Sequence, residues 1–215
     1  MSKIGVLGSG QVAQVLALGF KKHGHDVMLG SRDPAKLAAW QAEKGAGIAL
    51  GDFAAAARHA EIVVLAVLGR AAEGALALAG RENLAGKVVI DTTNPLDEKP
   101  PVNGMLQYFT PANDSLMEQL QRAFPEARLV KAFNSVGNPV MINPTFPGGR
   151  ATMFICGNDD AAKQQVAHIC DQFGWDAEDM GKVEVARAIE PLCQLWCARG
   201  FNRNEWSHAF KMVKA

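Results

Sequence analysis

The sequence has no excess of charge of either sign. Its 22 lysine and arginine residues equal its 22 aspartate and glutamate residues, so the formal net charge at pH 7 is +0. Proteins that bind nucleic acid or an anionic membrane surface typically carry a basic excess. The balance therefore predicts that neither a nucleic acid nor a membrane is a partner.

Long apolar runs are also missing. No apolar stretch reaches the length that crosses a bilayer, and the first residues show no basic segment followed by an apolar one. We therefore expect a protein without a membrane span or a secretory signal, located in the cytoplasm.

Cysteine is scarce, with four residues in a chain of 215. Cys193 and Cys197 lie four residues apart on an expected helix, which places both on one face and could supply half of a metal site. No second pair of cysteine or histidine residues completes such a site. We therefore expect buried, reduced thiols, typical of a cytosolic protein, and no bound metal.

A glycine-rich turn near the N-terminus is the most informative feature that is present. It is Gly8-Ser9-Gly10-Gln11-Val12-Ala13, and it lies between a strand-like stretch at residues 3–7 and a helical pattern at 11–23. This is the spacing and context of a dinucleotide-binding turn. Gly8 permits the tight turn, and Gly10 lets backbone N–H groups at the helix start approach a pyrophosphate.

The residues after the second expected strand, at 26–29, distinguish the two common dinucleotides. A site for NAD normally has a carboxylate here that binds the free ribose 2′-hydroxyl, but this chain has Gly30, Ser31 and Arg32. A guanidinium pairs with the 2′-phosphate of NADP, and Lys36 is expected to face the same phosphate. The predicted cofactor is NADP; the alternative is that Arg32 is only a solvated surface charge.

Strand-like and helical segments alternate along almost the whole chain. Further strands are expected at residues 61–67, 87–92, 127–133 and 151–156, with short ones at 48–50 and 175–178. The alternation predicts an α/β fold of the Rossmann type, a doubly wound and mostly parallel sheet with a C-terminal helical segment. We expect an NADP-binding domain at residues 1–182 and a helical appendage at 183–215, with helices at 183–199 and 202–213.

Ligands of an open α/β sheet bind beyond the C-terminal ends of its strands. The cofactor-binding residues expected at the later strand ends are Ala66, Val67, Leu68, Thr92, Asn94, Pro95, Ala132 and Asn134. The apolar members would cover an adenine or ribose face, and the uncharged polar ones would lie near the nicotinamide. Asn94 and Asn134 are equally consistent with plain turn formation, since Asn-Pro and Asn-Ser pairs favour turns.

None of these strand ends carries an evident proton donor. Reduction of a carbonyl normally needs such a donor, yet no Lys–Asn, Tyr–Lys or His–Asp arrangement is found there, and the five histidines are expected elsewhere. Hydride transfer to a redox ring depends more on orientation. We therefore expect a redox ring or a metal complex as the acceptor and assign no catalytic residue.

Four segments together resemble the NADPH-dependent oxidoreductases of the deazaflavin coenzyme F420. They are the turn at 8–13, Leu29-Gly30-Ser31-Arg32-Asp33-Pro34, Asp91-Thr92-Thr93-Asn94-Pro95 and Val130-Lys131-Ala132-Phe133-Asn134-Ser135. The cytoplasmic reductase domain of six-transmembrane ferric reductases is similar. Residues 186–196 resemble the family's terminal helix, so the likeness covers nearly the whole chain.

This resemblance implies a cofactor site and the place of a second substrate. It implies that NADP is held by residues 9–12, by Ser31 and Arg32, and by Lys36. It further implies an acceptor ring stacked on the nicotinamide near residues 134–137. The resemblance is specific for the fold group and does not specify the acceptor.

Three functions remain open from the sequence. The first is NADP(H)-dependent hydride transfer to a deazaflavin, flavin or quinone-like ring. The second is an imine or carbonyl reductase whose site is completed by a partner chain. The third is a non-catalytic module that senses NADP.

Large aromatic side chains are dense in the C-terminal segment. Trp196, Phe201 and Trp206 exceed what one core-facing stripe needs. We expect a homodimer in which this segment packs against its mate and walls the acceptor site, and the alternative is that these aromatics form an intrachain core. Residues 105–109 are expected to form an exposed patch on the other side of the acceptor.

Overall fold

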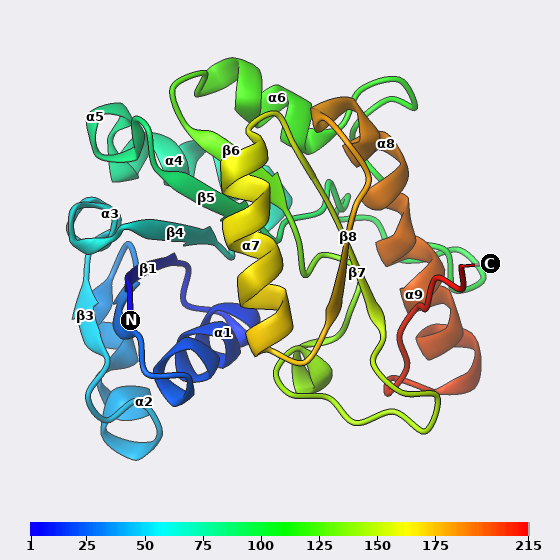
Figure 1. Cartoon of the computed structure of the whole chain (residues 1–215), viewed down its shortest axis with the longest axis horizontal. Helices are drawn as coiled ribbons and strands as arrows, with labels where there is room; N and C mark the ends of the chain where they lie inside the picture. The colour runs from blue at the N-terminus through cyan, green and yellow to red at the C-terminus, as the bar shows by residue number, and fades with distance from the viewer. Residues whose placement is uncertain (215) are drawn as a thin grey trace.

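The computed structural model describes residues 1–214; Ala215, the last residue of the expected appendage, lies outside the described residues. Eight strands form one sheet in the order β3-β2-β1-β4-β5-β6-β7-β8 (Figure 1). Their bounds are Lys3–Leu7 (β1), Asp26–Gly30 (β2), Ala49–Gly51 (β3), Ile62–Leu65 (β4), Val88–Asp91 (β5), Arg128–Lys131 (β6), Thr152–Gly157 (β7) and Asp176–Asp179 (β8). Only β6 and β7 pair antiparallel. The mostly parallel α/β fold is confirmed.

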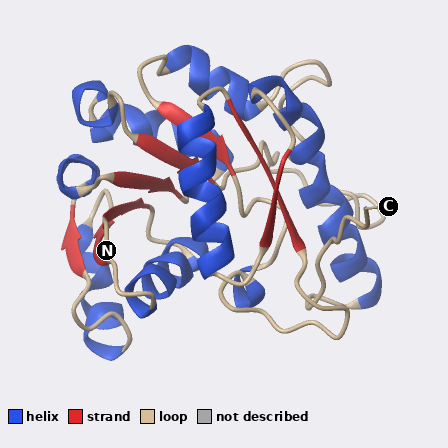
Figure 2. Ribbon diagram, in the orientation of Figure 1, coloured by secondary structure: helices blue, strands red, loops and turns tan. Residues whose placement is uncertain are grey.

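Helices cover both faces of this sheet (Figure 2). One core cluster contains side chains of α1 (Gln11–Lys22) and α7 (Asp160–Gln172). The cluster on the opposite face contains side chains of α3 (Phe53–His59), α4 (Ala72–Ala79), α6 (Leu116–Ala123) and α8 (Ala186–Ile189). The remaining helices are α2 (Ala38–Glu43), α5 (Arg81–Leu84), α9 (Pro191–Arg203) and 3-10 turns at Pro34–Leu37, Gly69–Ala71, Asn138–Val140 and Val183–Val185. Within residues 1–214 no helix has the length and apolar character of a membrane span.

The parallel strands end level with one another. Leu7 pairs in register with both Gly30 and Leu65, Leu65 pairs with Asp91, and Asp91 pairs with Lys131. The C-terminal ends of β2, β1, β4, β5 and β6 therefore lie along one edge, which we call the strand-end edge. Strand order reverses between β1 and β4, and ligands of open α/β sheets bind at such a reversal.

The expected helix at residues 202–213 is wrong. α9 ends at Arg203, and Asn204 follows in the left-handed region with φ +53°. Beyond it the chain runs along the start of β7, where Thr152 donates its N–H to Phe210 O at 2.9 Å and its Oγ1 accepts from Met212 N at 2.9 Å. Because β6 pairs only with the far end of β7, the start of β7 offers free backbone groups that this segment satisfies.

The expected exposed patch at residues 105–109 is correct only for Met105. The Tyr108 hydroxyl donates to Glu190 O at 2.6 Å, and the Arg70 guanidinium lies 4.8 Å above the Phe109 ring. Gln194 of α9 also donates to Leu106 O at 2.8 Å. The loop is therefore tied to α9 and half-buried along most of this stretch.

Candidate functional site

Gly8 and Gly10 are required for different reasons. Gly8 has φ +143°, and a Cβ there would lie 2.1 Å from the carbonyl oxygen of Ala66, so the turn packs tightly against the end of β4. A Cβ on Gly10 would meet no protein atom within 4 Å. Gly10 therefore faces open space at the start of α1, which is the room a ligand needs there.

The first turn of α1 presents unused backbone donors to this space. Its first hydrogen bond runs from Gln14 N to Gly10 O at 3.0 Å, and no side chain caps the helix. Within residues 1–214 the N–H groups of Gln11, Val12 and Ala13 therefore have no acceptor. Together with the positive end of the helix dipole, they suit a pyrophosphate. The turn is braced by Gln14, whose Nε2 donates to Ser9 O at 2.9 Å.

Arg32 and Lys36 lie on the exposed turn after β2, but their side chains differ in availability. Ser31 is buried, and its Oγ accepts from Asp33 N at 3.2 Å, which shapes the turn. The Arg32 side chain makes no hydrogen bond or ion pair within the described residues. Lys36 Nζ lies 3.7 Å from the Asp33 carboxylate. Arg32 is therefore free to bind an anion, whereas Lys36 shares its charge with Asp33.

The ends of β4, β5 and β6 complete the edge with mostly apolar or internally bonded groups. Leu68 exposes 78% of its surface beside the turn after β4, where the apolar face of a ligand can cover it. Thr92 Oγ1 donates to Leu65 O at 2.9 Å, so its proton is already used. Five expected residues lie at these ends with little or half exposure: Ala66, Val67, Thr92, Pro95 and Ala132.

Asn94 and Asn134 bind each other across the strand-end edge. Asn94 Nδ2 donates to Asn134 O at 2.8 Å, and Asn134 Nδ2 donates to Asn94 Oδ1 and to Ile189 O, both at 3.0 Å. Asn134 Oδ1 is buried and has no donor within the described part of the chain. A buried acceptor without a donor is costly, so an amide N–H of a ligand fits this position. The pair does more than form turns.

Phe133 holds the backbone turn that directs Asn134. It follows β6 with φ +59°, a left-handed conformation that bulky residues rarely adopt, and its ring is fully buried. Strained residues of this kind concentrate at functional sites, because the surrounding structure must hold them in place. Here the left-handed turn at Phe133 places the next residue, Asn134, in contact with Asn94.

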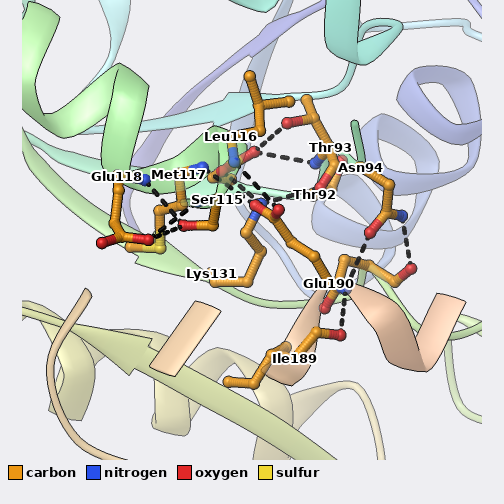
Figure 3. Close-up of polar contacts among 12 residues, drawn as sticks. Thr92, Thr93, Asn94, Ser115, Leu116, Met117, Glu118, Lys131, Ile189 and Glu190 are labelled. Carbon is orange, nitrogen blue, oxygen red and sulfur yellow. Dashed lines mark hydrogen bonds and ion pairs between the residues drawn. The ribbon is translucent and has the colours of Figure 1, made fainter. Parts of the chain in front are cut away.

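A buried ion network lies next to these asparagines and was not expected from the sequence (Figure 3). Lys131 Nζ lies 2.6 Å from Asp91 Oδ2 and 2.9 Å from Glu190 Oε1, and it donates to Thr93 O at 2.9 Å. The three charged side chains are at most 2% exposed. A signal was available, because Asp91 and Lys131 follow pairs of apolar residues at the ends of buried strands, where an unpaired charge is not tolerated.

The two carboxylates of the network accept hydrogen bonds and donate none. Asp91 Oδ1 accepts from the N–H and the hydroxyl of Thr93, and the Glu190 carboxylate accepts from the N–H groups of Leu116 and Met117 at 3.0 Å. Every neighbour is a donor, which leaves no acceptor for a carboxylic proton. Burial works against the ammonium, yet the two carboxylates raise the pKa of Lys131 above its ordinary value. The lysine at this strand end therefore offers no proton for chemistry.

The cysteines form no metal site within residues 1–214. All four are free, and no group of three or more histidine, cysteine, aspartate or glutamate side chains could hold a metal ion there. Cys193 and Cys197 lie on one face of α9 as expected, with Sγ atoms 4.0 Å apart.

Comparisons with known proteins agree with this geometry. Residues 3–95 match the family model described as NADP oxidoreductase, coenzyme F420-dependent. The F420-dependent NADP reductase of Methanothermobacter marburgensis is 31% identical over 206 residues, which cover 90% of each chain. A crystal structure from Arthrobacter sp. FB24, described as a candidate F420-dependent NADP reductase, superposes with a TM-score of 0.93 at 37% identity and covers 100% of both chains.

A second group of relatives is longer than this chain. The metalloreductase STEAP3 of Rattus norvegicus is 30% identical over 190 residues, which are 88% of this chain and 36% of that protein. The chain thus spans about a third of the length of this relative.

Proposed function

Because the chain belongs to the family of coenzyme F420-dependent NADP oxidoreductases, we propose that it transfers a hydride between NADP(H) and a deazaflavin, flavin or quinone-like ring. The observation that carries the proposal is the convergence of three features on the strand-end edge. They are the open space at Gly10, the free guanidinium of Arg32 and the unpartnered Oδ1 of Asn134.

Each feature fits one part of the cofactor. The free amides of α1 bind the pyrophosphate, and Arg32 pairs with the 2′-phosphate. Asn134 Oδ1 accepts from the carboxamide of the nicotinamide, while Asn94 holds the Asn134 side chain in place. The reduced nicotinamide supplies the hydride when it is bound.

Two candidate proton donors near the strand-end edge, Lys131 and Tyr108, are already engaged within residues 1–214, which supports a ring acceptor over a carbonyl. Lys131 Nζ lies 2.6 Å from Asp91 Oδ2, 2.9 Å from Glu190 Oε1 and 2.9 Å from Thr93 O, and the Tyr108 hydroxyl already donates to Glu190 O. Burial raises the pKa of Tyr108, which keeps its proton in place. A redox ring accepts the hydride without simultaneous proton transfer from the protein, so orientation is the main requirement.

The test is an acceptor panel with the purified protein and NADPH. The panel contains coenzyme F420, a flavin mononucleotide, a water-soluble quinone and a cyclic imine, and the loss of NADPH absorbance is followed for each. We expect turnover with at least one of the three ring acceptors and none with the imine. Turnover confined to the imine would establish the imine reductase alternative. Tight NADPH binding without turnover on any acceptor would favour the NADP-sensing module.

A further inference from the structure

The buried network behind the asparagines has a net charge. It contains one ammonium, on Lys131, and two carboxylates, on Asp91 and Glu190, so its formal charge is −1. The N-terminal amides of α6 that bind Glu190 offset part of this charge without cancelling it. All of it lies in a region without solvent access, where an ionic charge acts over a longer range than at the surface.

The titratable groups packed around the network do not neutralise it. Burial raises the pKa of Cys156 to about 12, so this thiol is neutral. Tyr108 keeps its proton for the same reason, and the pKa of Cys193 is raised by its hydrogen bond with Cys197 and by burial. Glu118 forms its own pair with Arg187, with Nε and Oε2 2.9 Å apart. The excess negative charge therefore remains.

This charge lies next to the expected nicotinamide contacts in the chain as well as in space (Figure 3). Asp91 directly precedes Thr92, and Lys131 holds Thr93 O, which precedes Asn94. Glu190 follows Ile189, whose carbonyl binds Asn134 Nδ2 at 3.0 Å. Every strand end that is expected to contact the nicotinamide is thus attached to the network.

We propose that Asp91, Lys131 and Glu190 tune the cofactor by favouring the oxidised nicotinamide over the reduced one. The inference rests on the proposed function, because it takes the nicotinamide to lie at Asn94 and Asn134. Loss of a hydride, which carries two electrons and one proton to the acceptor, leaves the ring with one positive charge. A buried negative charge behind the ring stabilises that form and so promotes hydride donation.

The test compares the affinities for NADP+ and NADPH in two variants. Glu190→Gln and Asp91→Asn each bring the network to neutrality from a different element. The ratio of the Kd for NADP+ to the Kd for NADPH is measured by titration of tryptophan fluorescence. We expect each variant to raise the ratio about tenfold, because it removes one unit of buried negative charge.

A matched control separates charge from structural damage. Glu118→Gln makes the same kind of substitution in the first turn of α6. The charge of Arg187, which then lacks its partner, is screened by solvent because this side chain is 41% exposed. This variant is expected to keep the ratio of the unsubstituted protein. General damage weakens both cofactors in proportion and leaves the ratio unchanged, so an unchanged ratio in folded Glu190→Gln and Asp91→Asn would overturn the proposal.

The unsubstituted protein gives a second measurement in case neither variant folds. With the network intact, NADP+ must bind at least as tightly as NADPH, and a tenfold preference for NADPH would contradict the tuning role. Failure of the proposed function is distinguishable, because it appears as an absence of turnover on the ring acceptors, whereas the ratio of the two Kd values is measured without any acceptor. Binding of both forms without the expected ratio removes the tuning role alone.

Discussion

At the scale of single residues, we propose that Arg32 selects NADP over NAD. Its guanidinium is exposed and has no partner in the described chain, and β2 ends in Gly30 where a site for NAD has a carboxylate that binds the free 2′-hydroxyl. Charge-assisted hydrogen bonds contribute about 1.5–3 kcal/mol each. Arg32→Ala should therefore weaken NADPH binding roughly tenfold or more and leave NADH binding little changed. Titrations of both cofactors measure this.

Lys36→Ala is the matched control for this substitution. It removes a cation from the same turn, but one that already shares its charge with Asp33. We expect a smaller loss of NADPH affinity than for Arg32→Ala. Equal losses of NADPH and NADH in Arg32→Ala would show that Arg32 has a structural role instead.

Gly10→Val tests the pyrophosphate site. A Cβ at Gly10 meets no protein atom within 4 Å, so a side chain there costs the fold little while it fills the space at the start of α1. We expect loss of binding of both cofactors with little change in Tm. Gly74→Val is the control, because Gly74 also faces open space but lies in α4. A folded Gly10→Val protein with full affinity would rule out the motif assignment.

Residues whose role depends on spacing along the chain could be predicted, and those whose role depends on distant partners could not. The turn at 8–13 is encoded locally, so Gly8 is found as expected at a positive φ against β4. The buried charge of Lys131 is explained by Asp91 on the neighbouring strand and by Glu190, which lies far along the chain on the break between α8 and α9. The pairing with Glu190 follows from the packing of α8 on the sheet, which no local pattern encodes.

The same limit applies at the scale of elements. The parallel strands were predicted because burial on both faces demands continuous apolar runs. No helix forms beyond Arg203, because backbone groups of residues 210 and 212 bind Thr152 at the free edge of β7 and are not available for helical hydrogen bonds. A helical pattern reports side-chain spacing, and it carries no information about an unpaired strand elsewhere in the fold.

The start of α6 provides a prediction on how stability depends on pH, because Glu118 of its capping box also forms an ion pair. Ser115 and Glu118 exchange hydrogen bonds at the start of the helix, and Arg187 of α8 pairs with the Glu118 carboxylate. Burial opposes this charge, but Arg187 and Ser115 hold the pKa of Glu118 below its ordinary value of 4.5. Its stabilising effect is therefore complete at neutral pH and is lost as the pH falls below 4.5.

Glu118→Gln should lower stability by about 1–2 kcal/mol at neutral pH, or about 2–8 °C in Tm. The difference from the unsubstituted protein should shrink as the pH falls through the depressed pKa, because both chains then lack the charge. Thermal unfolding from neutral to acidic pH measures this. Glu73→Gln, at an exposed site in the first turn of α4, should give a small difference that does not follow this profile.

At the scale of the whole molecule, the structure alters the assembly hypothesis. Trp196 is only 6% exposed, its ring stacks on His208 at 4.8 Å, and its Nε1 donates to His208 O at 2.8 Å. The intrachain alternative is therefore correct for this residue, and Trp196→Ala would test folding instead of assembly. The large apolar side chains left exposed on and after α9 are Leu195, Phe201, Trp206 and Val213.

We therefore propose that a homodimer forms through the exposed face of α9, and that Leu195→Glu dissociates it. Leu195 is 60% exposed, so a glutamate is tolerated in the monomer but is costly in an apolar interface. Light scattering at micromolar concentration should show a dimer for the unsubstituted protein and a monomer for the variant. Leu78→Glu, at a 58% exposed site on α4, should remain a dimer.

The same variant tests whether the dimer completes the acceptor site. α9 contacts the loop at 96–109 and lies beside Gly137, where the acceptor ring is expected. If the partner subunit covers that site, the Leu195→Glu variant should keep its affinity for NADPH and lose acceptor turnover, because water then reaches the nicotinamide. Full turnover by a monomeric variant would separate assembly from chemistry, and a monomeric unsubstituted protein would end the assembly proposal altogether.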